Sequence, residues 1–351
     1  MTEHSTAASA AATSTAPRKA TSAFPQRFYV YMALLALFLV LPALGAYPVL
    51  VLKGLCFALF ACAFNLLLGY TGLLSFGHAA FFGLATYSTG HAMKVFDLPM
   101  PLGLLAGVVA AGLLGLLTGW LAIRRSGIYF SMITLALAQM LYFIFLQAPF
   151  TGGEDGLQGV PRGSFFGISL ANDLTLYFVV LGIFSAAFLL IDRTLHSPFG
   201  QVLKAIRENE PRAISLGYDV DRYKLLAFVM SAALSGLAGS LKTVVLGFAT
   251  LSDALWTTSG AVILMTLLGG LATMTGPILG AFLVVALENK VGEAGRWLAD
   301  LTGIQWFGTL GESVTIVTGL IFVLVVLAFR RGLVGEFSAW WERMQAQRKK
   351  T

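Results

Sequence analysis

Charged residues are scarce in this chain of 351 amino acids. Asp, Glu, Lys and Arg make up 11% of the sequence, whereas hydrophobic residues make up 57%. A soluble domain carries about 25% charged residues, so the few charges here cannot cover the surface of a soluble protein of this size. The mean hydropathy of +0.81 agrees with this. The composition excludes a water-soluble globular protein and indicates an integral membrane protein, in which the 38 glycines fit closely packed helices.

Cysteines and catalytic motifs are also nearly absent. The two cysteines, Cys56 and Cys62, exclude a disulfide framework. They lie on different faces of one apolar segment, so we expect no metal site between them. The chain contains no G-x-x-x-x-G-K-[ST], H-E-x-x-H or G-x-S-x-G motif. These absences exclude a P-loop ATP site, a zinc protease site and a nucleophile elbow, and we expect neither a cofactor nor an enzymatic activity.

The chain contains many long apolar runs. About 20 apolar residues span a bilayer as a helix. Ten runs are present, near 28–45, 48–68, 78–93, 102–123, 127–147, 174–192, 224–246, 256–271, 276–291 and 309–329. We predict an all-α, polytopic transmembrane bundle of about ten spans. Eight spans are the alternative, because the third, eighth and ninth runs are short and Gly-rich, as broken or re-entrant segments are.

The middle of the chain divides these runs into two sets. Five runs precede the Gly-rich loop at 148–173 and five follow it. Five is an odd number, so the two halves would cross the membrane in opposite directions. This arrangement predicts an inverted 5+5 repeat of the kind found in transporters.

The basic residues predict the orientation. Lys and Arg accumulate in cytoplasmic loops. With the N-terminus inside, the inside segments hold 16 of the 23 Lys and Arg residues; these segments are 1–27, 69–77, 124–126, 193–223, 272–275 and 330–351. The net charge of +6 is thereby explained without a nucleic-acid partner. Near the outer end of the ninth run we expect Glu288 and Lys290 to form a local pair or to extend towards the membrane surface.

The organisation predicted from these patterns has three parts. Residues 1–27, rich in Ala, Ser and Thr, form a disordered cytoplasmic tail; residues 28–330 form the membrane domain; residues 331–351 form a cytoplasmic C-terminal tail. Arg18 and Lys19 followed by an apolar run also resemble a signal peptide. A retained signal-anchor is preferred, because the count of ten spans requires the first run.

Inside loop 193–223 is the only long one on its side, and we expect it to contain a short helix. Ser197 is a suitable N-cap and Pro198 suits the first helical position. Pro211 ends the helix. An apolar stripe at i, i+3, i+4 and i+7 is formed by Phe199, Val202, Leu203 and Ile206.

This helix has two interpretations. The simpler one places it on the bilayer surface. Surface-bound helices are usually rich in Lys and Arg, whereas the tip here carries both signs of charge in Arg207, Glu208, Asn209 and Glu210. A mixed tip suits a groove on a partner protein better.

Two Gly-rich stretches remain. The stretch 69–83 joins the second and third runs, and 267–281 forms an inside turn. Both are explained by turns and helix packing. The alternative for the first stretch is that its backbone and polar side chains line a translocation path. Asn65, Ser75 and His78 are the candidates, chosen only as polar residues in apolar surroundings.

Three sequence blocks carry a resemblance to a known family. They are GYTGLLSFGHAAFFGLATY at 69–87, SPFGQVLKAIRENEPRAISLGYDVDRYKLLAFVMSAALSGLAGSL at 197–241 and GGLATMTGPILGAFL at 269–283. From about residue 47 to 330 the chain resembles the high-affinity branched-chain amino acid ABC permeases, and most closely the M-type member of the paired permease subunits. The second block is long and specific, and the other two are weaker alone.

The resemblance implies a type II ABC importer permease in the bacterial inner membrane, with both termini in the cytoplasm. Such a permease pairs with a homologous second permease, two cytoplasmic ATP-binding cassette ATPases and an extracytoplasmic binding protein. Its coupling helix corresponds to residues 198–209, so Phe199, Ile206, Arg207, Glu208, Asn209 and Glu210 would contact the ATPase. The implied substrates are Leu, Ile and Val. Related permeases carry urea, short amides or other amino acids, and a stand-alone secondary carrier is a further alternative.

Overall fold

The computed structural model describes residues 24–45, 47–302 and 332–336, together with positions 319, 320, 323 and 327. The tenth apolar run at 309–329 and most of both predicted tails therefore lie outside the described residues. The chain divides into two compact units, residues 1–45 and 46–351.

One helix is described in the first unit, α1 (Phe24–Val40). Pro25 lies in its first turn, where the N–H that proline lacks would have no partner in the helix. Pro42 follows the helix end, in a turn at 41–45. The helix corresponds to the first predicted run, 28–45.

Five helices among the described residues are long and apolar enough to cross a membrane. All belong to the second unit and match predicted runs to within a few residues. They are α2 (Pro48–Thr71), α4 (Met100–Ala122), α5 (Ile128–Gln147), α6 (Asp173–His196) and α9 (Val220–Leu246). α2 and α9 each end at a glycine in the left-handed conformation, Gly72 (φ 76°) and Gly247 (φ 76°).

The outward faces of three of these helices are apolar. Leu113 of α4, Met132 of α5 and Leu190 of α6 are all exposed on the isolated chain. Soluble monomers rarely expose apolar surface on this scale. The described helices therefore form a multi-pass bundle that lipid can surround, as the composition predicts.

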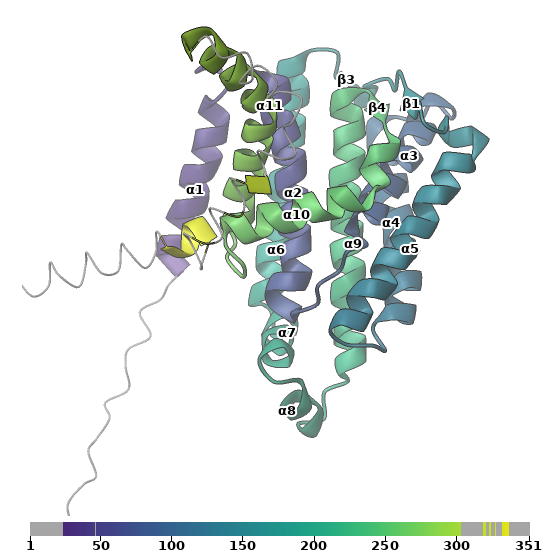
Figure 1. The fold of residues 1–351 in the computed structure, drawn as a ribbon, viewed down its shortest axis with the longest axis vertical. Coiled ribbons are helices and arrows are strands. Elements are labelled where there is room, and N and C mark those ends of the chain that lie inside the picture. Colours follow the sequence, from purple (N-terminus) through teal and green to yellow (C-terminus); the bar gives the residue numbers. More distant parts are fainter. Residues whose placement is uncertain are drawn as a thin grey trace, which may run out of the picture. The chain divides into compact units, whose positions relative to one another are not determined.

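Two further helices of the bundle are shorter than the five spanning helices, and each follows a segment without α-helix that enters the bundle. α3 (His78–Lys94) follows residues 72–77, and α10 (Trp256–Gly269) follows residues 247–255. Figure 1 shows α10 lying across the long helices near the middle of the bundle. The count of ten spans is therefore not confirmed, because the eighth predicted run does not follow the direction of the others.

Hydrogen bonds hold α10 at this depth. The backbone N–H of Ala79, in the first turn of α3, donates to Ser259 Oγ in the first turn of α10 (2.8 Å). Nearer the other end of α10, Thr266 Oγ1 donates to the carbonyl oxygen of Val262 within the helix (2.8 Å) and lies 3.4 Å from the carbonyl oxygen of Ala61 in the middle of α2. Both ends of α10 thus contact the interior of the bundle.

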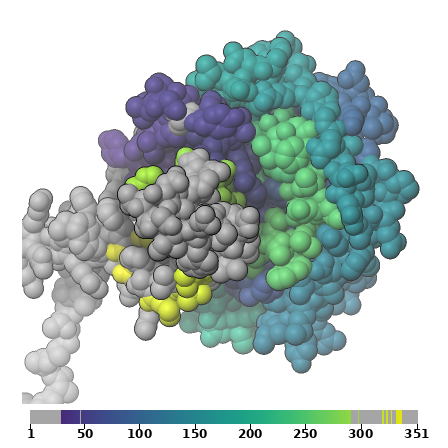
Figure 2. Space-filling view, turned by 45° about the horizontal axis from the view of Figure 1, so that its top comes forward, coloured from purple at the N-terminus to yellow at the C-terminus, as the bar shows by residue number. Residues whose placement is uncertain are grey.

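Four two-residue strands depart from the all-α prediction. β1 (Leu157–Gln158) pairs antiparallel with β4 (Phe248–Ala249), with Leu157 opposite Ala249. β2 (Ser164–Phe165) and β3 (Ile168–Ser169) form a hairpin. Figure 2 shows the green segment around α10 next to the teal loop at this end of the bundle. The β1–β4 pair fastens the loop at 148–172 to the segment that leads into α10.

Close packing of α4 against α9 depends on small residues. A Cβ added to Gly115 would lie 2.4 Å from the Cβ of Ala232, and one added to Gly236 would lie 2.3 Å from the Cβ of Ala111. Such approaches exclude any larger side chain unless the helices move apart. Aromatic rings fill the neighbouring core, in which Phe81 and Phe228 pack edge to face (5.5 Å between centroids).

The last fully described helix is α11 (Gly276–Thr302), which follows the Gly-rich turn at 270–275. Between α6 and α9 lie two helices too short and polar to span, α7 (Pro198–Glu208) and α8 (Glu210–Ser215). Figure 1 shows them at one extremity of the bundle, opposite the strands. We call this extremity the α7–α8 end.

Candidate coupling site and buried polar contacts

The start of α7 confirms the sequence prediction. The Ser197 side chain accepts a hydrogen bond from the backbone N–H of Gly200 (3.4 Å), and Pro198 is the first helical residue. Pro211 has a different role from the one predicted, since it lies in the first turn of α8. The helix stops instead at Asn209, whose Oδ1 accepts from the N–H of Arg212 (3.0 Å) and caps α8.

The apolar stripe of α7 packs against the chain itself. Ile206 is only 2% exposed and belongs to a small core with Ala213 and Val220. Phe199 stacks on the ring of Tyr223 (5.6 Å between centroids). A direct contact between an ATPase and Ile206 is therefore not available in this conformation, and any role of Phe199 and Ile206 in coupling would be to hold α7 on the bundle.

The charged tip of α7 also has contacts within the chain. The guanidinium group of Arg207 donates to the carbonyl oxygen of Gly69, near the end of α2. Lys224 of α9, with a side chain 5% exposed, donates to Glu210 Oε1 (2.6 Å). Glu208 and Asn209 are exposed, and the Asn209 side chain is used in the cap of α8. Of the six predicted coupling residues, Glu208 is therefore the one whose side chain is most clearly open to a partner.

An exposed apolar patch next to α7 was not predicted from the sequence. Ile214 is 57% exposed, Leu216 68% and Tyr218 41%. They follow one another at alternate positions where α8 ends and the chain turns at Gly217 (φ 88°). We call these three residues the α8 patch. The only signal for it was a short apolar group within the most polar loop of the sequence.

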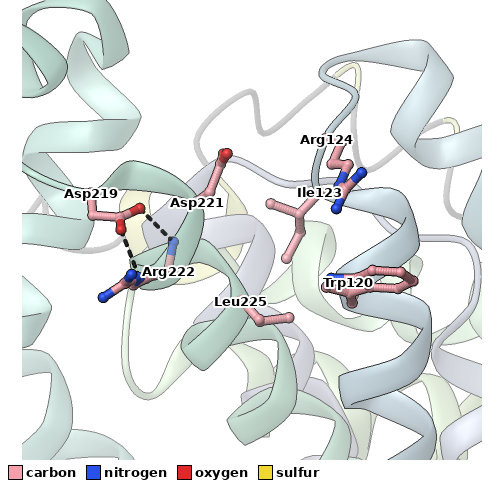
Figure 3. Close-up of a pocket in the computed structure, with 8 residues that line it drawn as sticks. Trp120, Ile123, Arg124, Asp219, Asp221, Arg222 and Leu225 are labelled. Atoms are coloured by element: carbon pink, nitrogen blue, oxygen red, sulfur yellow. Dashed lines mark hydrogen bonds and ion pairs between the residues drawn. The ribbon is translucent and has the colours of Figure 1, made fainter.

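A cleft of about 270 Å³ lies beside this patch, between the end of α4 and the start of α9. Figure 3 shows Trp120 and Arg124 on one wall, and the ion pair of Asp219 and Arg222 on the other. The Arg222 side chain is 2.7 Å from Asp219, and Arg124 lies over the Trp120 ring (5.0 Å). The cleft thus presents both signs of charge next to the exposed apolar patch.

The predicted pathway residue Asn65 joins α2 to the turn at 270–275. Its Nδ2 donates to the carbonyl oxygen of Thr273 (2.8 Å), and its Oδ1 accepts from the N–H of Ala272 (3.0 Å). Tyr70 adds a third link, donating through its hydroxyl to the Ala272 carbonyl (3.0 Å). These contacts join the end of α2 to the turn at 270–275, which brings two of the Gly-rich stretches of the sequence together.

Ser75 and His78 are both completely buried. Ser75 Oγ accepts from the N–H of Gly77 (3.2 Å). His78 Nε2 is 2.8 Å from Ser231 Oγ, which itself donates to the carbonyl oxygen of Ala63 (2.6 Å). The Ser231 hydroxyl has one proton, which it donates to the carbonyl oxygen of Ala63. His78 Nε2 therefore donates to Ser231 Oγ, so the proton of the neutral imidazole is on Nε2. A place on the translocation pathway stays a prediction for all three polar residues; Asn65 and His78 join elements of the bundle, and the contact of Ser75 lies within its own segment.

A buried ion pair was missed by the sequence analysis. Lys242 of α9 donates to Asp253 Oδ2 in η2 (Leu251–Ala254), the single turn that precedes α10 (2.7 Å). The two side chains are 5% and 10% exposed. The same oxygen accepts from the N–H and from the hydroxyl of Thr250 (3.0 Å each). The sequence signal was a lysine within a predicted span, which indicates a buried partner.

The described residues hold no group of three or more His, Cys, Asp or Glu side chains that could bind a metal ion. The arrangement instead links an exposed tip to the interior: α7 contacts α2, and α2 contacts the turn between α10 and α11. Such a chain of contacts can carry a displacement of α7–α8 to the middle of the bundle.

Comparisons with known proteins agree with this architecture. A model of the family described as branched-chain amino acid transport system / permease component matches residues 48–328. The high-affinity branched-chain amino acid transport system permease protein LivM of Salmonella typhimurium is 28% identical over 273 residues, or 68% of this chain and 64% of that protein. LivM of Escherichia coli gives the same values. The chain therefore spans slightly less than two thirds of these curated relatives.

Permeases for other substrates are also similar. The ribose import permease protein RbsC of Bacillus subtilis is 28% identical over 186 residues, which cover 51% of each chain.

Proposed function

Since the chain belongs to the family of branched-chain amino acid transport system / permease components, we propose that it is the membrane subunit of an ATP-driven importer of Leu, Ile and Val. It has no catalytic role of its own. ATP is hydrolysed by two cytoplasmic ATPases, and the second half of the pathway comes from a homologous permease. An extracytoplasmic binding protein delivers the substrate.

The observation that carries this proposal is the pair α7–α8. It lies outside the bundle, exposes Ile214, Leu216 and Tyr218 at its tip, and is tied inward by Arg207. An exposed apolar patch of this kind indicates a protein interface. In the proposed importer the α8 patch enters a groove on the ATPase, and the mixed charges of the cleft in Figure 3 contact its rim.

Orientation follows from the same element. The segment 193–223 holds five of the Lys and Arg residues, so the α7–α8 end faces the cytoplasm of a bacterial cell and the β1–β4 pair faces outward. The N- and C-terminal segments lie on the cytoplasmic side in this arrangement.

An inverted 5+5 repeat is supported by corresponding elements in the two halves. α2 and α9 are both long, and each ends at a glycine with φ 76°. Each is followed by a segment without α-helix and then by a short helix that begins inside the bundle, α3 and α10. The first turns of these short helices meet through Ala79 and Ser259. Related halves that rock against each other are a known route to alternating access.

Substrate uptake in cells tests the proposal. A strain that lacks the chain is complemented with it, and uptake of labelled leucine, urea and ribose is measured. We expect restored uptake of leucine only. Restored uptake of urea or ribose alone would replace the proposed substrate, and the ribose permease relative makes ribose a necessary arm of the test.

Substitutions in the α8 patch test whether it couples the chain to the ATPase. Leu216→Asp places a charge on the proposed apolar contact and should abolish leucine uptake, while Leu216→Met should retain it. Unchanged uptake by Leu216→Asp would contradict the docking assignment. Gradient-driven leucine uptake by the purified chain alone in liposomes would instead establish a secondary carrier.

A further inference from the structure

A second, larger cavity lies at the side of the transverse helix α10. Its volume is about 660 Å³, within the roughly 300–1,000 Å³ of typical small-molecule sites. One face of α10 forms part of its lining, through Thr257, Gly260, Ala261 and Leu264. The opposite face of α10, with Ser259 and Thr266, is buried in the bundle. One face of α10 therefore packs against the interior of the bundle, and the opposite face lines the cavity. We call this second face the floor of the cavity.

The walls of the cavity come from α2 and α11, together with Gly319. Phe57 of α2 lies one turn from Ala61, the residue that α10 contacts, in the direction of the start of α2. Val284 and Glu288 of α11 line the other side. The cavity therefore extends from α10 towards the end of the bundle opposite α7–α8.

Glu288 lines the cavity at this end, and its ion-pair partner Lys53 lines an adjoining cavity of about 360 Å³. Lys53 Nζ is 3.3 Å from Glu288 Oε2, and the side chains are 28% and 36% exposed. Lys53 is eight residues before Ala61, which places the pair about 12 Å from α10 along α2. The sequence analysis expected a local pair between Glu288 and Lys290, and the partner found in the structure is Lys53.

The residues that line the cavity favour one chemical class of small-molecule ligand. Its floor and walls are mostly apolar, and its charged lining residue Glu288 lies at one end, where Lys53 Nζ is 3.3 Å away on the side of the adjoining cavity. In an α-amino acid the ammonium and carboxylate groups are attached to one carbon atom, so a single zwitterion can contact a carboxylate and an ammonium that are already adjacent. Small-molecule sites commonly combine an apolar lining with a few polar groups that set orientation.

We propose that this cavity is an intramembrane binding site for a zwitterionic amino acid with an apolar side chain, whose ammonium group contacts Glu288 and whose carboxylate contacts Lys53. The apolar side chain lies along Phe57 and the open face of α10. This inference rests on the proposed function and names the site within the chain where the substrate pauses. Binding near the middle of the membrane beside an interrupted helix is the usual arrangement in transporters.

Gly260 allows a direct test of the cavity. A Cβ added there meets no atom within 4 Å, so a side chain at this position enters the cavity without a clash. Gly182 of α6 is a matched control, because it is also helical and open but lies away from the cavity. In the complete transporter, Gly260→Trp should abolish leucine uptake and Gly182→Trp should not. Equal uptake by both variants would overturn the site.

Binding of leucine in the cavity is measured separately from leucine uptake. Gly260→Cys is labelled with a maleimide in membranes that contain the complete transporter, since Cys56 and Cys62 are buried. Leucine should slow the labelling of Gly260→Cys but not of Gly182→Cys. The probe 4-methylpentanoate has the same carbon skeleton and a carboxylate but no ammonium, and it should not protect. With Glu288→Gln added, about tenfold or more leucine should be needed for the same protection.

The outcomes separate the two proposals. If wild-type cells take up leucine but leucine does not protect Gly260→Cys, the cavity is not the site and the proposed function stands. Equal protection by leucine and 4-methylpentanoate would overturn the role of Glu288. A Gly260→Cys thiol that is not labelled at all would show that a lipid chain or a neighbouring subunit fills the cavity. Protection by leucine in a transporter that does not take it up would leave the site standing and contradict the proposed function.

Discussion

The buried pair of Lys242 and Asp253 gives the sharpest test of the forces that hold α10 in place. Lys242→Met keeps the length of the side chain and removes its charge. The carboxylate of Asp253 then stays buried with only its two contacts from Thr250. Removing one member of a buried ion pair typically costs about 3–5 kcal/mol, because the remaining charge is not compensated. We expect Lys242→Met to lower the free energy of unfolding by about this amount.

The double variant Lys242→Met/Asp253→Leu separates the cost of an uncompensated buried charge from the effect of changed packing. Replacing both charges with apolar groups of similar size is often close to neutral. The double variant also loses the cap that Asp253 provides to Thr250, which is worth about 0.5–2 kcal/mol. We therefore expect it to be more stable than Lys242→Met by about 2 kcal/mol, although it carries one more substitution.

Lys53→Met is a matched control for Lys242→Met. This variant breaks a lysine–carboxylate pair of the same kind, but the partners are 28% and 36% exposed rather than 5% and 10%. Exposed pairs contribute about 0–1 kcal/mol. Thermal or denaturant unfolding of the purified protein in detergent compares the three variants. If Lys242→Met costs no more than Lys53→Met, burial does not set the strength of the inner pair and the reasoning is refuted.

Two further predictions concern packing and the turn at 270–275. Asn65→Leu should destabilise the protein by about 1–3 kcal/mol, because two part-buried backbone groups of that turn lose hydrogen bonds worth about 0.5–1.5 kcal/mol each, and unfolding in detergent measures the loss. Gly115→Leu should separate α4 from α9 and reduce the yield of folded protein, since an added Cβ already meets a neighbour at 2.4 Å. Gly112→Leu, with its nearest contact at 3.7 Å, should be tolerated, and equal loss in both would contradict the packing argument.

The positions of the spanning helices could be predicted because they depend on local composition. The run at 48–68 became α2 at 48–71, and the run at 127–147 became α5 at 128–147. A bilayer requires about 20 apolar residues whatever the fold, so a run of that length needs no knowledge of its neighbours. The start of α7 was predictable for a similar reason, because Ser197 and Pro198 act on their own turn.

The direction and packing of an element could not be predicted in this way. The stripe that contains Ile206 showed that one face of α7 is apolar, but the same stripe fits a partner's groove or the chain's own core. The run at 256–271 is counted among the ten predicted spans, with a broken or re-entrant segment as the alternative; its helix is only 14 residues long and lies across the bundle, which fits the alternative. Lys242 and Asp253 are eleven residues apart, on two elements whose contact depends on the turn between them.

The turn at 270–275 connects the two proposals of mechanism. It joins the end of α10, which is the floor of the cavity, to the start of α11, which carries Glu288. Asn65 and Tyr70 fasten this turn to α2, and Arg207 fastens α7 to the same end of α2. In the proposed importer, a pull on α8 by an ATPase would act on two sides of the cavity through one set of hydrogen bonds. If this route carries coupling, Asn65→Leu should impair ATP-driven uptake more than Gly112→Leu at equal amounts of folded protein in the membrane.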